Sequence, residues 1–454
     1  MAVLPGTFVV AGCHIATCDA GGTEHANGYL VVEGGRIAAV GAGAVPAEYA
    51  AAERVDGTGC LLTPGLVNTH SHLYQWITRG YATDHTLFQW LTTLYPVWAR
   101  LTDELVHAAA AGNLAWLALS GCTTSTDHHY VFPRGAGDLL AAEIEAAQQI
   151  GLRFHPSRGS MNLGVSAGGL PPDAVVEDHD EILAATKAAI DRWHDPSPGS
   201  MLRIAVAPCS PFSVTGDLMR DAAALARAED VRLHTHIAET ADEDDFCMAT
   251  FGRTAAEYAE DLGWLGPDVW LAHCVHLSPD AVERLAATGT GVAHCPSSNG
   301  RLGAGVAPVR DLLDAGVAVG LGVDGAASNE SGRLMDEMHI ALLVARAKGG
   351  PLALAARESL RMATIGGARC IGRDDELGSL EPGKLADLVL WRVDGLAGAG
   401  IDDPVSTLTL GAPRVERVYV GGRAVVDGGE LRTADAETIA ASSARAAATI
   451  AGPG

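Results

Sequence analysis

Two histidines stand on alternate residues in the segment NTHSHLYQW, which covers residues 68–76 and follows the apolar run LLTPGLV. Side chains alternate between the two faces of a strand, so His70 and His72 point the same way. Two imidazoles on one face can bind one metal ion, but polar residues at a strand end are also common, and short motifs match by accident. The pair alone leaves both interpretations open.

The segment VRLHTHIAET repeats this spacing with His234 and His236, and Glu239 follows three residues later. The run GLGVDGAASN leaves Asp324 after an apolar stretch, where an isolated carboxylate is costly unless it is paired or binds a cation. Taken singly, His234 is a packed barrel histidine and Asp324 caps a loop. Taken together, the pattern predicts one divalent metal ion with the ligands His70, His72, His236 and Asp324. Three imidazoles and a carboxylate suit zinc, and iron or cobalt would also fit.

The elements that must position these residues are predicted strands of a parallel sheet. Short apolar runs alternate with alanine-rich amphipathic stretches such as residues 103–121 and 241–263. The strand candidates are LLTPGLVN, GCTTSTD, GLRFHPSR, MLRIAVAPC, VRLHTH, DVWLAHC, GVAHC and VAVGLGVD. Eight strands over roughly 300 residues predict an α/β fold with a closed (β/α)8 TIM barrel, whose site forms at the carboxyl ends of the strands. An open doubly wound sheet is the alternative, although no Gly-x-Gly-x-x-Gly follows the first strand.

Both ends of the chain have a sequence pattern that differs from that of the middle. Residues 7–59 and the later runs ADLVLWRV and RVERVYVGGRAVVDGGEL read as short strands separated by glycine turns. We expect the two ends to form one small composite β-sandwich. The predicted domains are 1–63 for its N-terminal part, 64–372 for the metal-dependent barrel, and 373–454 for its C-terminal part and a tail.

Composition restricts the class of partner. The formal net charge is -24, and lysine occurs only at positions 187, 348 and 384, so no basic stripe is available for nucleic acid or an anionic membrane. No window approaches the ~18 apolar residues of a membrane helix. Nine cysteines without a C-x-x-C pair argue against a disulfide framework or a thiolate zinc site, so we expect a cytoplasmic protein.

The segments TPGLVNTHSH, HTHIAE, LAHCVH and GVDGAASN together resemble the amidohydrolase superfamily, and GSLEPGKLADLVL resembles its C-terminal signature. The resemblance implies a distorted (β/α)8 barrel with a composite β-sandwich, and a homodimer or larger homo-oligomer. It supports the four metal ligands residue by residue. Binuclear members usually bridge two metals with a carboxylated lysine at a strand end. Since no lysine of this chain lies there, we expect a mononuclear site.

In the deaminase branch of this superfamily the glutamate of His-x-x-Glu moves protons, which assigns that catalytic role to Glu239. Chemistry supports it, because a metal ion acidifies water and a nearby carboxylate can carry the proton to a ring nitrogen. The same resemblance implies that His273 orients or polarises the attacking oxygen and that Asp324 passes a proton to the departing ammonia. The alternative for Glu239 is a solvated carboxylate at a helix start, because ETADEDD is acidic throughout.

Candidates for substrate contacts come from the loops after the first three strands. Residues 73–98 hold seven aromatic residues, most of which we expect to pack the loop or a dimer contact. Gln75 is the exception, since its amide can read an amide edge as donor and acceptor. His128 and Arg158 could donate to ring carbonyls, although Arg158 could equally form an ion pair at the barrel rim. His294 and Asn299 are weaker candidates.

The strings HLYQWITRG, TTSTDHHYVFP, SRGSM, APCSPFSV and THIAETADEDDFC are most similar to the 8-oxoguanine deaminases, within the triazine-hydrolase and guanine-deaminase-like branch. This similarity implies a hydrolytic deaminase of a planar amino-substituted N-heterocycle, with 8-oxoguanine giving urate and ammonia. The alternatives are a hydroxyatrazine or amino-s-triazine hydrolase, by dealkylamination or dechlorination, and a deaminase of guanine or a pterin. An amidase acting on a ring amide and a noncatalytic metal-binding protein are more distant alternatives.

Overall fold

A computed structural model describes residues 6–411 and 413–452 of the chain. Eight strands pair in parallel around a closed barrel, and each overlaps one of the eight predicted apolar runs. They are β6 (Leu66–Asn68), β8 (Cys122–His129), β9 (Arg153–Ser160), β10 (Ala205–Pro208), β11 (Leu233–Ile237), β12 (Val269–His273), β13 (Gly291–His294) and β14 (Val319–Leu321). The prediction of a closed barrel is confirmed, and the alternative of an open sheet is wrong.

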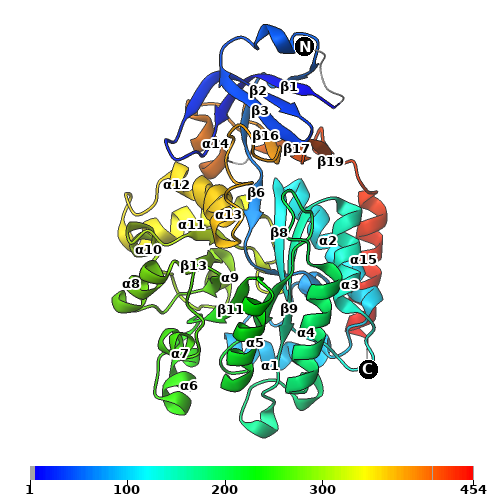
Figure 1. Ribbon diagram of the computed structural model, residues 1–454, viewed down its shortest axis with the longest axis vertical. Coiled ribbons are helices and arrows are strands. Elements are labelled where there is room, and N and C mark those ends of the chain that lie inside the picture. The colour runs from blue at the N-terminus through cyan, green and yellow to red at the C-terminus, as the bar shows by residue number, and fades with distance from the viewer. Residues whose placement is uncertain (1–5, 412, 453–454) are drawn as a thin grey trace.

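Helices surround the barrel strands, as Figure 1 shows. They are α2 (Asp103–Leu119), α3 (Leu139–Ile150), α4 (His179–Trp193), α5 (Gly216–Ala228), α6 (Ala241–Phe251), α7 (Ala255–Asp261), α8 (Pro279–Thr288), α9 (Pro296–Arg301), α10 (Val309–Asp314), α11 (Leu334–Gly349), α12 (Ala356–Arg361) and α13 (Gly367–Cys370). A π-helical turn over Met362–Gly366 joins the last two.

The amphipathic stretch 241–263 is two helices rather than one. Gly252 ends α6 with a φ of 66°, a left-handed conformation that glycine adopts at little cost. Thr254 then begins α7 with a capping box, in which its hydroxyl and the Glu257 side chain each bind a backbone N–H of the first turn. The local capping residues therefore override the continuous apolar pattern.

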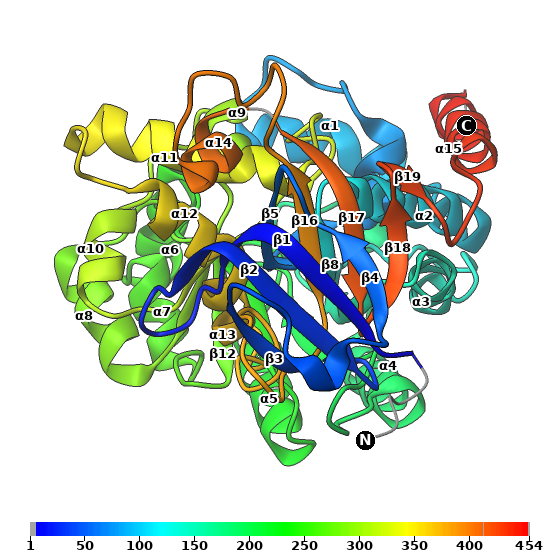
Figure 2. The same ribbon diagram turned by 90° about the horizontal axis from the view of Figure 1, so that it is seen from above.

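The strands from both chain ends form one nine-stranded sheet, which Figure 2 views from above. Its path is β19 (Glu430–Leu431), β18 (Arg423–Asp427), β17 (Arg414–Val420), β16 (Leu388–Arg392), β5 (Cys60–Pro64), β1 (Phe8–Ala16), β2 (Glu24–Glu33) and β3 (Arg36–Ala42), with β4 (Glu53–Asp56) paired to β1. The rings of Phe8 and Tyr419 stack at 4.9 Å although two strands separate theirs in the sheet. The sheet therefore curls over its own core, and the expected β domain from the two termini is confirmed.

The chain passes directly from this sheet into the barrel, because β5 ends at Pro64 and β6 begins at Leu66. The sheet accordingly lies at the amino-terminal ends of the barrel strands. The carboxyl ends open at the far end, where Figure 1 places α1 (Leu87–Trp98). We propose 1–63, 64–372 and 373–454 as domain limits on this arrangement.

The segment after the sheet returns to the barrel. Helix α14 (Pro404–Leu410) lies between β16 and β17 in the chain, and α15 (Ala436–Ala451) packs along α2. The Ser443 hydroxyl of α15 donates to the carbonyl of Ala108 at 3.0 Å. The predicted tail is thus part of the helical layer of the barrel.

Two further observations concern membrane and redox properties. Within residues 6–411 and 413–452, no helix has the length and apolar character needed to cross a bilayer. All nine cysteines are buried and unpaired.

Candidate active site

The predicted metal ligands lie at the carboxyl ends of the barrel strands. His70 follows β6, and His72 belongs to the short strand β7 (Ser71–His72), which pairs with β15 (Asp324–Gly325) after β14. His236 is the fourth residue of β11. The parallel pairing of β7 with β15 brings Asp324 beside the two histidines, although more than 250 residues separate them in the sequence.

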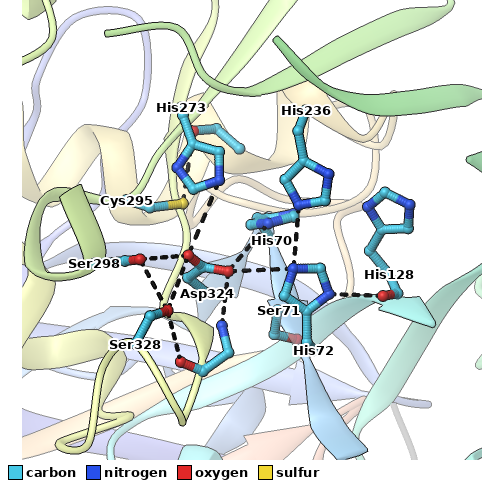
Figure 3. Close-up of polar contacts among 12 residues, drawn as sticks. His70, Ser71, His72, His128, His236, His273, Cys295, Ser298, Asp324 and Ser328 are labelled. Atoms are coloured by element: carbon cyan, nitrogen blue, oxygen red, sulfur yellow. Dashed lines mark hydrogen bonds and ion pairs between the residues drawn. The ribbon is translucent and has the colours of Figure 1, made fainter. Parts of the chain in front are cut away.

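The four side chains converge on one point, as Figure 3 shows. The Asp324 Oδ1 atom lies 3.3 Å from the Nε2 atoms of both His70 and His72. The Nε2 atoms of His72 and His236 are 3.1 Å apart. All four residues are buried. The structure therefore brings together the whole predicted ligand set.

Hydrogen bonds on the far side of each ring fix which nitrogen faces this point. His72 Nδ1–H donates to the carbonyl of His128, and His236 Nδ1–H donates to the carbonyl of Cys209, both at 2.7 Å. Each Nε2 atom then carries a lone pair. This arrangement is the usual outer support of a metal-bound histidine.

His70 receives the same orientation through a second histidine. His234 Nδ1–H donates to the carbonyl of Trp270 at 2.8 Å, so its Nε2 atom accepts a hydrogen bond from His70 Nδ1–H, also at 2.8 Å. The His70 Nε2 atom consequently carries a lone pair, and it has no hydrogen-bond partner. His234, expected to be a packed barrel histidine, is thus the support of His70.

Electrostatics agree with these proton positions. Burial and the neighbouring imidazoles lower the pKa of His72 to about 3, and the pKa of His236 lies well below its ordinary value for the same reasons. Burial would raise the pKa of Asp324, but the contact with His70 at 3.3 Å and the nearby rings of His273 and His72 hold it well below its usual range. Three nitrogen lone pairs and a carboxylate oxygen therefore face one another, which is repulsive without a cation between them. Their donor types fit zinc or iron.

The Asp324 carboxylate is held from its other side by hydroxyl groups. Ser298 Oγ donates to Asp324 Oδ2 at 2.5 Å, and Ser328 Oγ donates to the same oxygen at 3.2 Å. The Gly325 N–H donates to Oδ1 at 2.7 Å. These contacts, drawn in Figure 3, leave the carboxylate little rotational freedom.

The backbone around the site adopts a conformation that non-glycine residues rarely occupy. The φ angles of Ala238, His273, Cys274 and Asp324 lie between 50° and 71°. Each such residue costs on the order of 1 kcal/mol and persists only where the surrounding structure enforces it. Four of them at or just beyond the carboxyl ends of β11, β12 and β14 show that the backbone there is held in fixed, strained positions.

Glu239 and His273 lie beside the ligand group. The distance from His273 Nε2 is 3.7 Å to Glu239 Oε2 and 3.9 Å to Asp324 Oδ2. Asn299 Oδ1 accepts a hydrogen bond from His273 Nδ1 at 2.9 Å, which turns Nε2 toward Glu239. Burial raises the pKa of Glu239 to about 7, with His273 lowering it and Asp324 raising it. The carboxyl group can therefore both accept and release a proton near neutral pH.

A cavity of about 370 Å³, counted with its open mouth, lies over these residues. Helix α1 supplies one wall with Leu87, Trp90, Leu91 and Tyr95. Gln75 reaches the cavity from the 3-10 helix η2 (Leu73–Thr78), and neither its amide oxygen nor its amide nitrogen has a protein partner. A planar ligand with a donor and an acceptor on one edge would satisfy both atoms.

The structure does not bring His128 or Arg158 to this cavity. His128 lies beneath the ligand group, stacked on His236 at 4.7 Å, and its Nε2–H donates to the carbonyl of Ala207. Arg158 is bound by two hydrogen bonds to Glu177 and lies over the Phe132 ring at 3.9 Å. The prediction that these two residues bind substrate is therefore not retained, and the alternative of a rim ion pair describes Arg158.

Sequence reasoning missed several residues that shape the site. Asn299, a weaker candidate for substrate contact, supports His273, and Ser298, which the sequence did not single out, supports Asp324. His294, buried at the end of β13, does not line the cavity. Glu243 was not considered, yet its two carboxyl oxygens accept from the N–H groups of Ala238 and Glu239 at 2.9 Å. The acidic run ETADEDDFC contains it, but only the tertiary structure distinguishes it from its solvated neighbours.

Comparison with known proteins decides the family. A family model described as the amidohydrolase family matches residues 61–425. The chain belongs to the amidohydrolase family. Members of this family depend on metal ions. Family membership and the deaminase relative below identify the protein as a hydrolase that acts on C–N bonds.

Two relatives and one solved structure illustrate the similarity. The chain is 46% identical over 443 residues to 8-oxoguanine deaminase of Pseudomonas aeruginosa, covering 96% of this chain and 98% of that one. It is 38% identical over 392 residues to hydroxydechloroatrazine ethylaminohydrolase of Pseudomonas sp. strain ADP, covering 84% and 80%. Atrazine chlorohydrolase from Arthrobacter aurescens, solved with zinc, superposes with a TM-score of 0.90 at 34% identity, covering 97% and 100%.

Proposed function

We propose that this amidohydrolase deaminates 8-oxoguanine, giving urate and ammonia, with one divalent metal ion held by His70, His72, His236 and Asp324. The proposed substrate rests on the 46% identity to an 8-oxoguanine deaminase over almost the full length of both chains. The convergence of three imidazole nitrogens and one carboxylate oxygen supports the metal, for which we propose zinc, with iron as the alternative.

The metal ion, when bound, supplies the Lewis acidity that makes water a nucleophile at neutral pH. The protein's own residues then manage protons. Glu239 takes the proton from the attacking water and delivers it from its carboxyl oxygen to a ring nitrogen of the heterocycle. A pKa of about 7 suits both steps, because neither protonation state is strongly favoured.

His273 and Asp324 complete the proposed machinery. The bond to Asn299 commits His273 Nδ1, so His273 Nε2 orients the incoming oxygen between Glu239 and Asp324. Asp324 is ionised and keeps one oxygen toward the hydroxyl groups of Ser298 and Ser328. It takes the remaining proton of the hydroxyl group that has added to the ring carbon and passes it to the amino group, which leaves as ammonia as the C–N bond breaks.

Recognition of the heterocycle is assigned to Gln75 and the wall formed by α1. An amide oxygen and an amide nitrogen that are buried without partners cost free energy until a ligand pairs with both. A lactam edge, with adjacent N–H and C=O groups, offers the complementary pair. The apolar side chains of Leu87, Trp90 and Leu91 suit the flat faces of a ring.

The test is a substrate panel with the metal-loaded protein. Ammonia release is followed with 8-oxoguanine, guanine, isoxanthopterin and hydroxyatrazine, and urate is identified as the product of the first. We expect kcat/KM for 8-oxoguanine to exceed the other values at least about tenfold, which corresponds to about 1.4 kcal/mol of discrimination. Equal activity on all four compounds, or activity only on another, would reject the proposed substrate.

A triazine hydrolase is the second candidate function. It is favoured by the 38% identity to hydroxydechloroatrazine ethylaminohydrolase and by the fold similarity to atrazine chlorohydrolase. The same site would displace an alkylamine or chloride in place of ammonia. Product analysis with N-ethylated and chlorinated triazines separates the two functions, because ethylamine or chloride would appear only in the second case.

A further inference from the structure

Residues 71–73 are held by three consecutive residues of β8. Regular pairing between β6 and β8 ends at Asn68 and Ser125. Beyond it, the Ser71 hydroxyl donates to the carbonyl of Thr126, and the His72 ring donates to the carbonyl of His128, both at 2.7 Å. The backbone of β8 thus holds the residues that carry the ligand imidazole of His72.

The third contact comes from a side chain. Asp127 Oδ1 accepts from the N–H group of Leu73 at 2.6 Å, and both residues are buried. Leu73 is the first residue of η2, where an N–H group has no partner within the helix. Asp127 therefore satisfies a buried donor that directly follows His72 in the chain, and it ties that donor to β8.

Two polar neighbours lie beside Asp127, one from the helical layer and one from its own strand. Glu143 of α3 and His129 of β8 lie close to it, with one polar atom of each of the three residues within 4.8 Å of the others. His129 Nε2–H donates to the carbonyl of Val131 at 2.9 Å, so its Nδ1 atom accepts from the Glu143 carboxyl group at 2.8 Å. Both ring nitrogens are then occupied, which makes this cluster a hydrogen-bonded support and not a second metal site.

We infer that Asp127 is a positioning residue for the metal centre, because it fixes the backbone after His72 and so the direction of the His72 imidazole. Its loss would leave the Leu73 N–H group buried without a partner. The Ser71 hydroxyl bond, the His72 ring bond and the pairing of β7 with β15 would remain. The backbone that follows His72 would lose its bond to β8, and the turn at Leu73 could move. The inference rests on the proposed metal site and is independent of the proposed substrate.

The experiment compares Asp127→Asn with Asp127→Ala in the full-length protein. Asparagine keeps the Oδ1 acceptor for Leu73, whereas alanine removes it. Zinc affinity is measured by competition with a chromophoric chelator, and the visible absorption of the cobalt-substituted protein reports ligand geometry. We expect Asp127→Ala to weaken zinc binding about 10- to 100-fold, the usual effect of losing an outer support, and to alter the cobalt spectrum. Asp127→Asn should restore both to within about threefold of the parent.

Four outcomes separate the possible failures. Unchanged zinc affinity and cobalt spectrum in Asp127→Ala overturn the inference, and so does a failure of Asp127→Asn to restore them. Absence of zinc binding by the parent rejects the metal site itself, whereas lack of 8-oxoguanine turnover with normal zinc binding rejects only the substrate. If Asp127→Ala does not fold, Asp127→Ser takes its place, because its shorter side chain cannot reach the Leu73 N–H group in the same way.

Discussion

In each imidazole of the proposed metal centre, one nitrogen makes a hydrogen bond to the protein and the other faces a shared point. His72 and His236 each donate this hydrogen bond to a backbone carbonyl. His70 donates it to His234, which in turn donates to the carbonyl of Trp270. The supports fix both tautomer and ring direction before any ion arrives. At this scale, chemistry is determined by which atom carries a proton, and substitutions that change one atom are the informative tests.

Replacing Glu239 with glutamine changes one such atom. The Glu239→Gln variant should lose turnover by about 100- to 10,000-fold, the usual range for a general acid–base group. Its metal content should be unchanged, because Glu239 is not among the four converging donors. Ammonia release gives the turnover, and elemental analysis gives the metal. Glu283→Gln, an exposed change on α8, is the matched control and should behave like the parent. Activity within tenfold of the parent would remove Glu239 from the mechanism.

Burial of Glu143 predicts a pH effect on stability. Burial raises its pKa to about 8, against about 4.3 in an unfolded chain. Between these values the native state keeps a proton that the unfolded state has lost, so the free energy of unfolding falls as pH rises, by at most about 1.4 kcal/mol per pH unit. Glu143→Gln mimics the protonated form, since its amide N–H can donate to His129 Nδ1.

Urea unfolding of parent and Glu143→Gln between pH 5 and pH 8 tests this effect. The variant should gain stability relative to the parent as the pH increases across this window. A difference in free energy that stays constant with pH would show that Glu143 is ionised in the native state.

The sequence reveals some of these residues and hides others for a physical reason. His70 and His72 are visible because a strand repeats every two residues, and Glu239 because it stands at a fixed distance from His236. Arg158 could not be assigned, since its partner Glu177 lies on a loop 19 residues away whose path depends on tertiary packing. His234 and Asp127 look like ordinary polar strand residues, and only their contacts identify them as supports.

At the scale of elements, helix α1 forms a wall of the cavity but is not one of the barrel strands. It carries the aromatic residues that the sequence indicated, but their roles divide. Trp98 is packed in the core, whereas Trp90 and Tyr95 line the cavity. Trp90 is tied to the carbonyl of Ala327 through its ring N–H, while the buried Tyr95 hydroxyl has no partner among the described residues. A strand or helix pattern predicts which residues face inward. It does not predict which of these contact other protein atoms and which contact the ligand.

Tyr95→Phe tests whether the free hydroxyl meets the substrate. A hydrogen bond from Tyr95 to the heterocycle is worth about 1 kcal/mol, so its loss should raise KM about fivefold with little change in kcat. Steady-state kinetics on the best substrate of the panel provide both constants. Tyr49→Phe, the same change in the small β domain and away from the cavity, is the control and should leave KM unchanged. An unaltered KM in Tyr95→Phe would mean that the hydroxyl meets only water.

At the scale of the whole molecule, the small sheet and the barrel are joined by a buried ion pair. Arg153, the first residue of β9, donates to both carboxyl oxygens of Asp387, just before β16, at 2.8 and 3.1 Å. The Gly421 N–H, between β17 and β18, donates to the same carboxylate at 2.7 Å. The barrel strands that carry the site and the sheet made from both chain ends are therefore anchored to one another. The sequence predicted both units, but not this link, because its residues are 234 positions apart.

Removing one member of this pair should destabilise the molecule as a unit. Asp387→Ala leaves the Arg153 guanidinium buried without a counter-charge, which costs about 3–5 kcal/mol. Because the pair spans the two units, thermal unfolding should move to lower temperature in a single transition, with loss of bound metal in the same step. Asp268→Ala breaks the exposed pair with Arg227 and should cost about 0–1 kcal/mol. Calorimetry of both variants gives the comparison, and an early transition that leaves the metal bound would show that the sheet unfolds independently of the barrel.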